Sequence, residues 1–154
     1  MKDLCPIKNL LLVIVISVAA LNNAQATDTL KMQLQAHKII KKPDGQSVSV
    51  AALNAKAGET VQYRATYTNV TNQPIKDVAV TLPIPANMTF TGEAQPSSAQ
   101  ATIDGKNYSD MPLIRKEKGK IVKIPLTEYK ALRWNIKWLP ANKTANVSLN
   151  TIVN

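Results

Sequence analysis

Apolar and polar residues alternate one by one along much of the chain, and this two-residue period is typical of a β-strand with one buried face. The clearest example is residues 58–90, where two alternating runs flank a polar turn at residues 69–74. The apolar positions are Val61, Tyr63, Ala65 and Tyr67 in the first run, and Val78, Val80 and Leu82 in the second. Pro83 and Pro85 end the second run, because proline has no N–H to give to a sheet. The pattern predicts a strand, a turn and a strand.

Further segments with the same period are separated by turn signals. They are residues 30–36, 47–53, 121–126, 132–138 and 145–153, and Asp104-Gly105 marks a hairpin between residues 102–103 and 107–108. Residues 127–132 are the only segment in which we expect a helical turn. Seven or eight short strands without an amphipathic helix predict an all-β fold, an antiparallel β-sandwich of immunoglobulin-like architecture.

The alternation also predicts which side chains fill the core. We expect the core to contain Tyr63, Tyr67, Val78, Val80, Trp134 and Ile136. Trp138 has the same parity as Trp134 but adjoins a turn, so we expect it to be partly exposed. Asn69 stands at the end of its strand, where asparagine commonly hydrogen-bonds the backbone of a turn.

The first 26 residues have a different composition from the rest of the chain. Lys2 and Lys8 precede an apolar run of 12 residues, 10–21, and Ala24-Gln25-Ala26 follows it. This is the three-part pattern of a secretory signal, with cleavage between Ala26 and Thr27. The alternative is a membrane anchor, but a membrane span needs roughly 20 apolar residues.

Cleavage at this point predicts an exported protein, periplasmic or extracellular, in which residues 27–154 form a single domain without a membrane anchor. Cys5 is the only cysteine and precedes the apolar run. The mature chain would therefore have no disulfide, no cysteine metal site and no cysteine nucleophile. A chain of 128 residues is long enough to bury a core without cross-links.

The chain is basic. Removal of residues 1–26 takes away Lys2, Lys8 and Asp3, which leaves 17 basic and 9 acidic residues and a formal charge of +8. Such an excess attracts polyanions, but it also simply keeps a protein soluble.

Two clusters concentrate the positive charge. They are Arg115, Lys116, Lys118, Lys120 and Lys123 in a predicted charged loop, and Lys38, Lys41 and Lys42. The first cluster is a candidate polyanion-binding site, and the alternative is a solvated hairpin tip. No aromatic residue lies within it, whereas nucleic-acid binding favours aromatic residues among the basic ones.

Residues 55–153 resemble a known family. The matching elements are Gly58-Glu59-Thr60-Val61, Tyr63, Tyr67-Thr68-Asn69, Gln73-Pro74, Val78, Val80, Leu82-Pro83, Pro85, Met88–Phe90, Leu132–Ile136, Leu139–Asn142 and Ala145–Val153. They are similar to the bacterial immunoglobulin-like "conserved repeat" family, also called domain-of-unknown-function family eleven. The resemblance implies an immunoglobulin-like module of secreted and surface proteins, and it implies no catalytic residue.

The chain departs from the family pattern in three places. Thr81 stands where the family often has an acidic residue, and Asn142 stands where the closing turn usually has glycine. Asparagine tolerates a positive φ, so we expect the turn to survive. Residues 107–126 have no clear counterpart and read as an insertion.

No group of residues points to catalysis. His37 is the only histidine, and the nine acids of the mature chain are scattered, mostly in predicted turns. We expect His37 to lie on the surface, and we expect no metal, no cofactor and no enzymatic activity. A hydrolase whose carboxylates meet only in the folded protein is the remaining enzymatic alternative.

These observations predict a structural or protein-interaction module that presents sheet edges and loops to an envelope or surface protein. The alternative is a binder of an anionic surface polymer (lipopolysaccharide, cell-wall polymer or nucleic acid) through residues 115–123.

Overall fold

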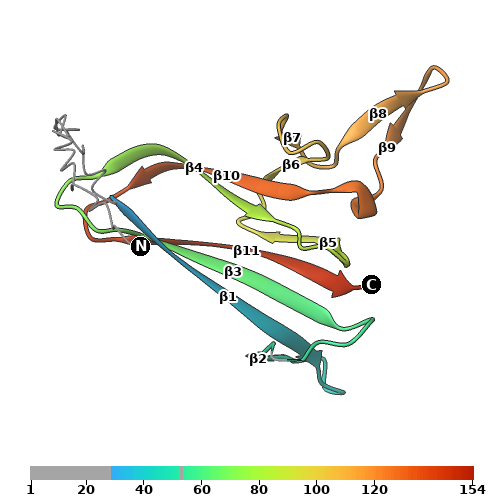
Figure 1. Cartoon of the computed structure of the whole chain (residues 1–154), viewed down its shortest axis with the longest axis horizontal. Coiled ribbons are helices and arrows are strands. Elements are labelled where there is room, and N and C mark those ends of the chain that lie inside the picture. The colour runs from blue at the N-terminus through green and yellow to red at the C-terminus, as the bar shows by residue number, and fades with distance from the viewer. Residues whose placement is uncertain (1–28, 53) are drawn as a thin grey trace, which may run out of the picture.

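The computed structural model describes residues 29–52 and 54–154. The predicted signal and its cleavage site between Ala26 and Thr27 lie outside the described residues. The described chain is an antiparallel β-sandwich of the immunoglobulin-like kind (Figure 1). Its strands are β1 (Leu30–Lys41), β2 (Ser47–Ala51), β3 (Thr60–Asn69), β4 (Ile75–Pro83), β5 (Met88–Gln95), β6 (Gln100–Thr102), β7 (Ser109–Asp110), β8 (Ile114–Glu117), β9 (Lys120–Lys123), β10 (Ala131–Leu139) and β11 (Thr144–Val153), with a single 3₁₀ turn, η1 (Leu126–Glu128).

The strands form two packed layers and a separate hairpin. One sheet has the order β2-β1-β3-β11-β5, the other has the order β4-β10-β6-β7, and β8 pairs only with β9. In Figure 1 the β8–β9 hairpin projects from one corner of the molecule, at the upper right, and β1 descends from the left to meet β2 at the bottom of the view. The hairpin therefore stands apart from the body of the sandwich.

Eleven strands are described where the sequence predicts seven or eight. The additional strands are very short, and β7 has only two residues. The sequence predicts a charged loop at residues 115–120, and this prediction is wrong, because residues 114–117 and 120–123 pair as the β8–β9 hairpin. The helical turn lies at residues 126–128, slightly before the stretch predicted for it.

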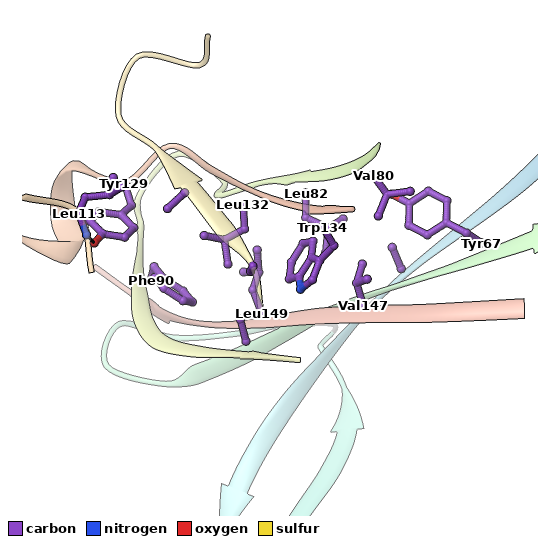
Figure 2. Close-up of a cluster of buried hydrophobic side chains, with 14 of the residues drawn as sticks. Tyr67, Val80, Leu82, Phe90, Leu113, Tyr129, Leu132, Trp134, Val147 and Leu149 are labelled. Atoms are coloured by element: carbon purple, nitrogen blue, oxygen red, sulfur yellow. Dashed lines mark hydrogen bonds between the residues drawn. The ribbon is translucent and has the colours of Figure 1, made fainter. Parts of the chain in front are cut away.

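The core fills the space between the two sheets. Trp134 in β10 lies opposite Val80 in β4, and Figure 2 shows Trp134 among Leu82, Leu149 and Val147. The Trp134 Nε1–H donates to the Pro96 carbonyl over 2.8 Å, so the indole is buried without an unpaired donor.

The expected core residues divide into two depths. Tyr67, Val80 and Trp134 are buried, whereas Tyr63, Val78 and Ile136 are partly buried and pack against the core. Burial raises the pKa of the Tyr63 and Tyr67 hydroxyls. Trp138 is half-exposed, with the Lys76 Nζ 5.3 Å from its ring centroid.

Asn69 joins two distant turns at one end of the sandwich. It is fully buried, and its Nδ2 donates to the carbonyls of Gln73, Leu139 and Pro140 over 2.7–3.1 Å. Its Oδ1 accepts hydrogen bonds from the backbone N–H and the hydroxyl of Thr71. The predicted contact with its own turn is present, and the same side chain also holds the loop that follows β10.

Two turns illustrate how side chains set the backbone. Asn142 adopts a φ of 57°, as expected for an asparagine at a position that favours glycine. Asp104 accepts hydrogen bonds from the N–H groups of Asn107 and Lys106, both over 2.8 Å. Hydrogen bonds from Asn107, Lys106 and Thr102 hold the pKa of Asp104 well below its usual value. The predicted hairpin around Asp104-Gly105 is present, but its paired strands are β6 and β7, which lie slightly outside the predicted residues 102–103 and 107–108.

Candidate interaction surfaces

The β8–β9 hairpin carries most of the predicted polyanion-binding residues. Its turn is Lys118-Gly119, and both residues have positive φ, 47° and 81°. Two central residues with positive φ define the type I′ turn, whose twist matches that of the strands it joins. The turn therefore presents Lys118 at the tip of a regular two-stranded ribbon.

The two faces of the hairpin differ in charge. Ile114 lies opposite Lys123, and Lys116 lies opposite Ile121, so one face alternates isoleucine with lysine. Ile114 and Ile121 are 59% and 74% exposed. Lys116, Lys118, Lys120 and Lys123 are all exposed. None of these four lysines forms an ion pair with another described residue.

Arg115 departs from the prediction, because it is engaged within the protein. It forms ion pairs with Glu117 and, over 2.6 Å, with Glu128. The hydrogen bonds that Arg115 donates, first to Glu128 and then to Glu117, raise the pKa of Arg115 above its usual value. No pattern in the sequence indicates the contribution of Glu128, which lies in η1. The positive charges of the hairpin that have no described carboxylate partner are therefore those of its four lysines.

The hairpin is fixed to the body at its base. Leu113 and Ile124 flank its two strands, and both are buried. The N–H of Ile124 donates to the Leu113 carbonyl, and the N–H of Leu113 donates to the Tyr129 hydroxyl over 2.8 Å. The Tyr129 ring stacks on Phe90 at a centroid distance of 6.0 Å. The tip is thus free while the base belongs to the core.

The second basic cluster lies on a different sheet. The Lys38 Nζ forms an ion pair with Glu59 at 3.0 Å. Hydrogen bonds from the Lys56 backbone N–H and from the Lys38 side chain lower the pKa of Glu59. Lys41 and Lys42 are exposed at the end of β1. In Figure 1 this end of β1 lies far from β8 and β9, so the two clusters do not form one basic surface.

β1 has an apolar face that the sandwich does not cover. Met32 lies opposite Tyr67 and Leu34 opposite Ala65, so both belong to the inner face of their sheet. They are nevertheless 52% and 50% exposed. The sequence predicted a half-buried strand at residues 30–36, and this expectation is wrong for Met32 and Leu34. The other sheet has four strands, and the exposure of Met32 and Leu34 shows that it leaves this part of β1 uncovered.

The same part of β1 has an open backbone edge. β2 pairs with residues 37–41 of β1, whereas residues 30–36 pair only with β3 among the described strands. Exposed apolar side chains and an unpaired strand edge thus coincide over one short segment. We call residues 30–36 the open edge of β1.

A depression of about 910 Å³ includes Lys38, Glu59 and Glu93 in its lining. His37 is half-buried rather than on the surface as expected, and its Nδ1 has no hydrogen-bond partner among the described residues. Within residues 29–52 and 54–154, no three histidines or acids lie close enough to hold a metal ion.

The described part of the chain contains no helix long and apolar enough to cross a membrane. Comparison of the chain with protein-family models, with curated proteins and with solved structures found no match.

Proposed function

We propose that this chain is an exported, non-enzymatic protein of the bacterial envelope, or of the medium around it, that works as a structural and protein-interaction module. The observation that supports this most is the open edge of β1. Unpaired backbone groups beside exposed apolar side chains are the features by which a sheet accepts a further strand from another chain. The resemblance of residues 55–153 to the conserved-repeat modules supports the same proposal.

Site-specific photo-crosslinking in living cells tests this function. A photoreactive residue replaces Leu34 in the open edge, and a second variant carries it at Thr144, an exposed position at the start of β11. Captured proteins are identified by mass spectrometry. We expect a defined envelope or surface protein at position 34 and none at position 144. Equal capture at both positions, or no protein at position 34, would contradict the proposal.

The β8–β9 hairpin supports a second function, the binding of an anionic surface polymer. Lys116, Lys118, Lys120 and Lys123 project from one small ribbon, and described carboxylates neutralise none of them. A contact of this kind weakens steeply as salt rises, because binding releases counterions from the polymer.

Binding of the purified chain to lipopolysaccharide, measured over a range of salt concentrations, tests this second function. Replacing Lys116, Lys118 and Lys120 together with Gln should abolish binding. The matched control replaces Lys41 and Lys42 with Gln, because both are exposed lysines outside the hairpin. Binding that persists at high salt, or that both variants lose equally, would exclude the hairpin as the polymer site.

A further inference from the structure

We propose that the open edge of β1 pairs with the same segment of a second copy of this chain, so that two sheets join across a two-fold axis through Gln33. The inference rests on the proposed interaction function and names its partner and its site. Residues 30–36 would run antiparallel to residues 30–36 of the second copy. The observations that carry it are the direction of the backbone groups, the side-chain pairing and the character of the other edges.

The backbone of the open edge points outward at the required residues. The N–H of Ala52 donates to the Ala36 carbonyl over 3.1 Å, so Ala36 directs its polar groups toward the side that β2 occupies. Groups on alternate residues of a strand point to the same side. Met32 and Leu34 therefore direct their N–H and C=O groups outward, where no described strand meets them.

An axis through Gln33 makes these groups meet. Met32 then faces Leu34 of the second copy, and these two residues can exchange two backbone hydrogen bonds. Leu30 faces Ala36, whose carbonyl already accepts from the N–H of Ala52, so this pair is left with one hydrogen bond, from the Ala36 N–H to the Leu30 carbonyl. The side chains of these pairs lie on the inner face, so the row of apolar side chains of one copy continues into that of the other. Half-exposed Met32 and Leu34 of each copy would then pack beside Leu34 and Met32 of the other.

The charges of the open edge fit a copy of itself. On the outer face Lys31 lies opposite Gln35 of the second copy, and Gln33 lies opposite Gln33. No cation faces a cation, and the two Lys31 side chains are separated by about 13 Å along the strands, beyond a Debye length of about 8 Å. Since Lys31 is the only charged residue in the segment, an acidic partner strand would gain little here.

The other long edge strands are less suited to pairing. Asp77 in β4 has a φ of 52°, and Pro83 ends that strand. Gly92 in β5 has a φ of 93°, and the pairing of β5 with β11 contains a bulge. Irregularities and prolines of this kind protect sheet edges from association. Along residues 30–36, by contrast, the pairing of β1 with β3 runs without a break.

A seven-residue contact is small, so the dimer should be reversible and concentration-dependent rather than obligate. Cysteine crosslinking in the full chain tests its register. Cys5→Ser removes the natural thiol, and Gln33→Cys then places a single cysteine on the proposed axis. Opposed residues of such a pair have Cβ atoms about 4.5 Å apart, near the separation of about 3.5–4.5 Å that a disulfide needs.

The register predicts three results under mild oxidation. Gln33→Cys should form a disulfide dimer in high yield. Lys31→Cys and Gln35→Cys should each form little dimer alone, because each faces the other position. A mixture of these two variants should form the mixed disulfide. Equal yields from all three single variants, or no dimer from Gln33→Cys, would overturn the proposed pairing.

Sedimentation without any cysteine provides an independent measurement. Leu34→Lys should weaken self-association about tenfold or more, because it places a cation in the apolar row. The control, Ile121→Lys, changes a still more exposed apolar residue on the hairpin and should leave association unchanged. A chain that remains monomeric at the highest soluble concentration contradicts the inference. Capture of a different protein at position 34 in cells would preserve the proposed function while rejecting self-pairing.

Discussion

Trp134 in β10 and Ile121 in β9 both lie on strands with alternating side chains, yet Trp134 is 2% exposed and Ile121 is 74% exposed. The first lies between two sheets, and the second lies on a ribbon that has no layer above it. Alternation builds a strand in both places, but a second layer determines whether an apolar side chain contributes to stability. The sandwich body therefore carries the fold, and the β8–β9 hairpin can vary with little cost.

The largest effect should follow from Trp134→Ala. This substitution empties the centre of the core and removes the hydrogen bond to Pro96, so we expect unfolding to become easier by about 3–5 kcal/mol. Chemical denaturation followed by circular dichroism measures this change. Ile121→Ala on the hairpin is the matched control and should change the free energy of unfolding by less than about 0.5 kcal/mol. Comparable losses would break the distinction between body and hairpin.

Asn69→Ala should produce the next largest loss. It leaves the Gln73, Leu139 and Pro140 carbonyls without the Nδ2 donor, and we expect a cost of about 1–3 kcal/mol. Asn69→Asp is a sharper variant, because at neutral pH it turns a carboxylate toward the same carbonyls and should destabilise the protein further. An Asp variant as stable as the Ala variant would show that the three carbonyls are satisfied by other donors.

Tyr129→Phe tests the junction between the two regions. It keeps the ring beside Phe90 and removes the acceptor for the Leu113 N–H. We expect a loss of about 1 kcal/mol in overall stability and faster hydrogen exchange at Leu113 and Ile124. Exchange that accelerates equally in β3 and β11 would mean that the hairpin base and the body open as one unit.

The smallest effect should come from Lys118→Asn. Asparagine followed by glycine is the preferred pair for this type I′ turn, so the hairpin should gain order while overall stability changes by less than about 0.5 kcal/mol. Amide exchange at Glu117 and Lys120 measures the local gain. A clear change in the unfolding midpoint of the whole protein would show that the tip is coupled to the core.

The sequence pattern predicts the all-β fold, because β3, β4, β10 and β11 each have one mainly apolar face. It does not predict which strand covers which face. Met32 and Leu34 follow the same alternation as Val61 and Ala65, but they are half-exposed because no strand lies above them. Local periodicity contains no information about the width of the opposite sheet.

The candidate surfaces were predictable to a similar extent. The lysines of the hairpin are visible in the sequence as a cluster, but the pairing of Arg115 with Glu128 depends on a turn 13 residues further along. Asn69 is a parallel case, since its nearby turn contacts follow from the local sequence while its contact with Leu139 spans 70 residues. Contacts between distant segments depend on the register of the sheets, which a single sequence does not reveal.

The position of β3 between β1 and β11 has a consequence for biosynthesis. A chain emerging from the ribosome can pair β3 with β1 early, but the other edge of β3 has no partner until residues 144–153 have been made. The sheet is therefore completed only after those residues have been synthesised, and pairing over such sequence distances is slow. Until those residues are made, β3 keeps one unpaired edge, so the chain remains only partly folded during translation.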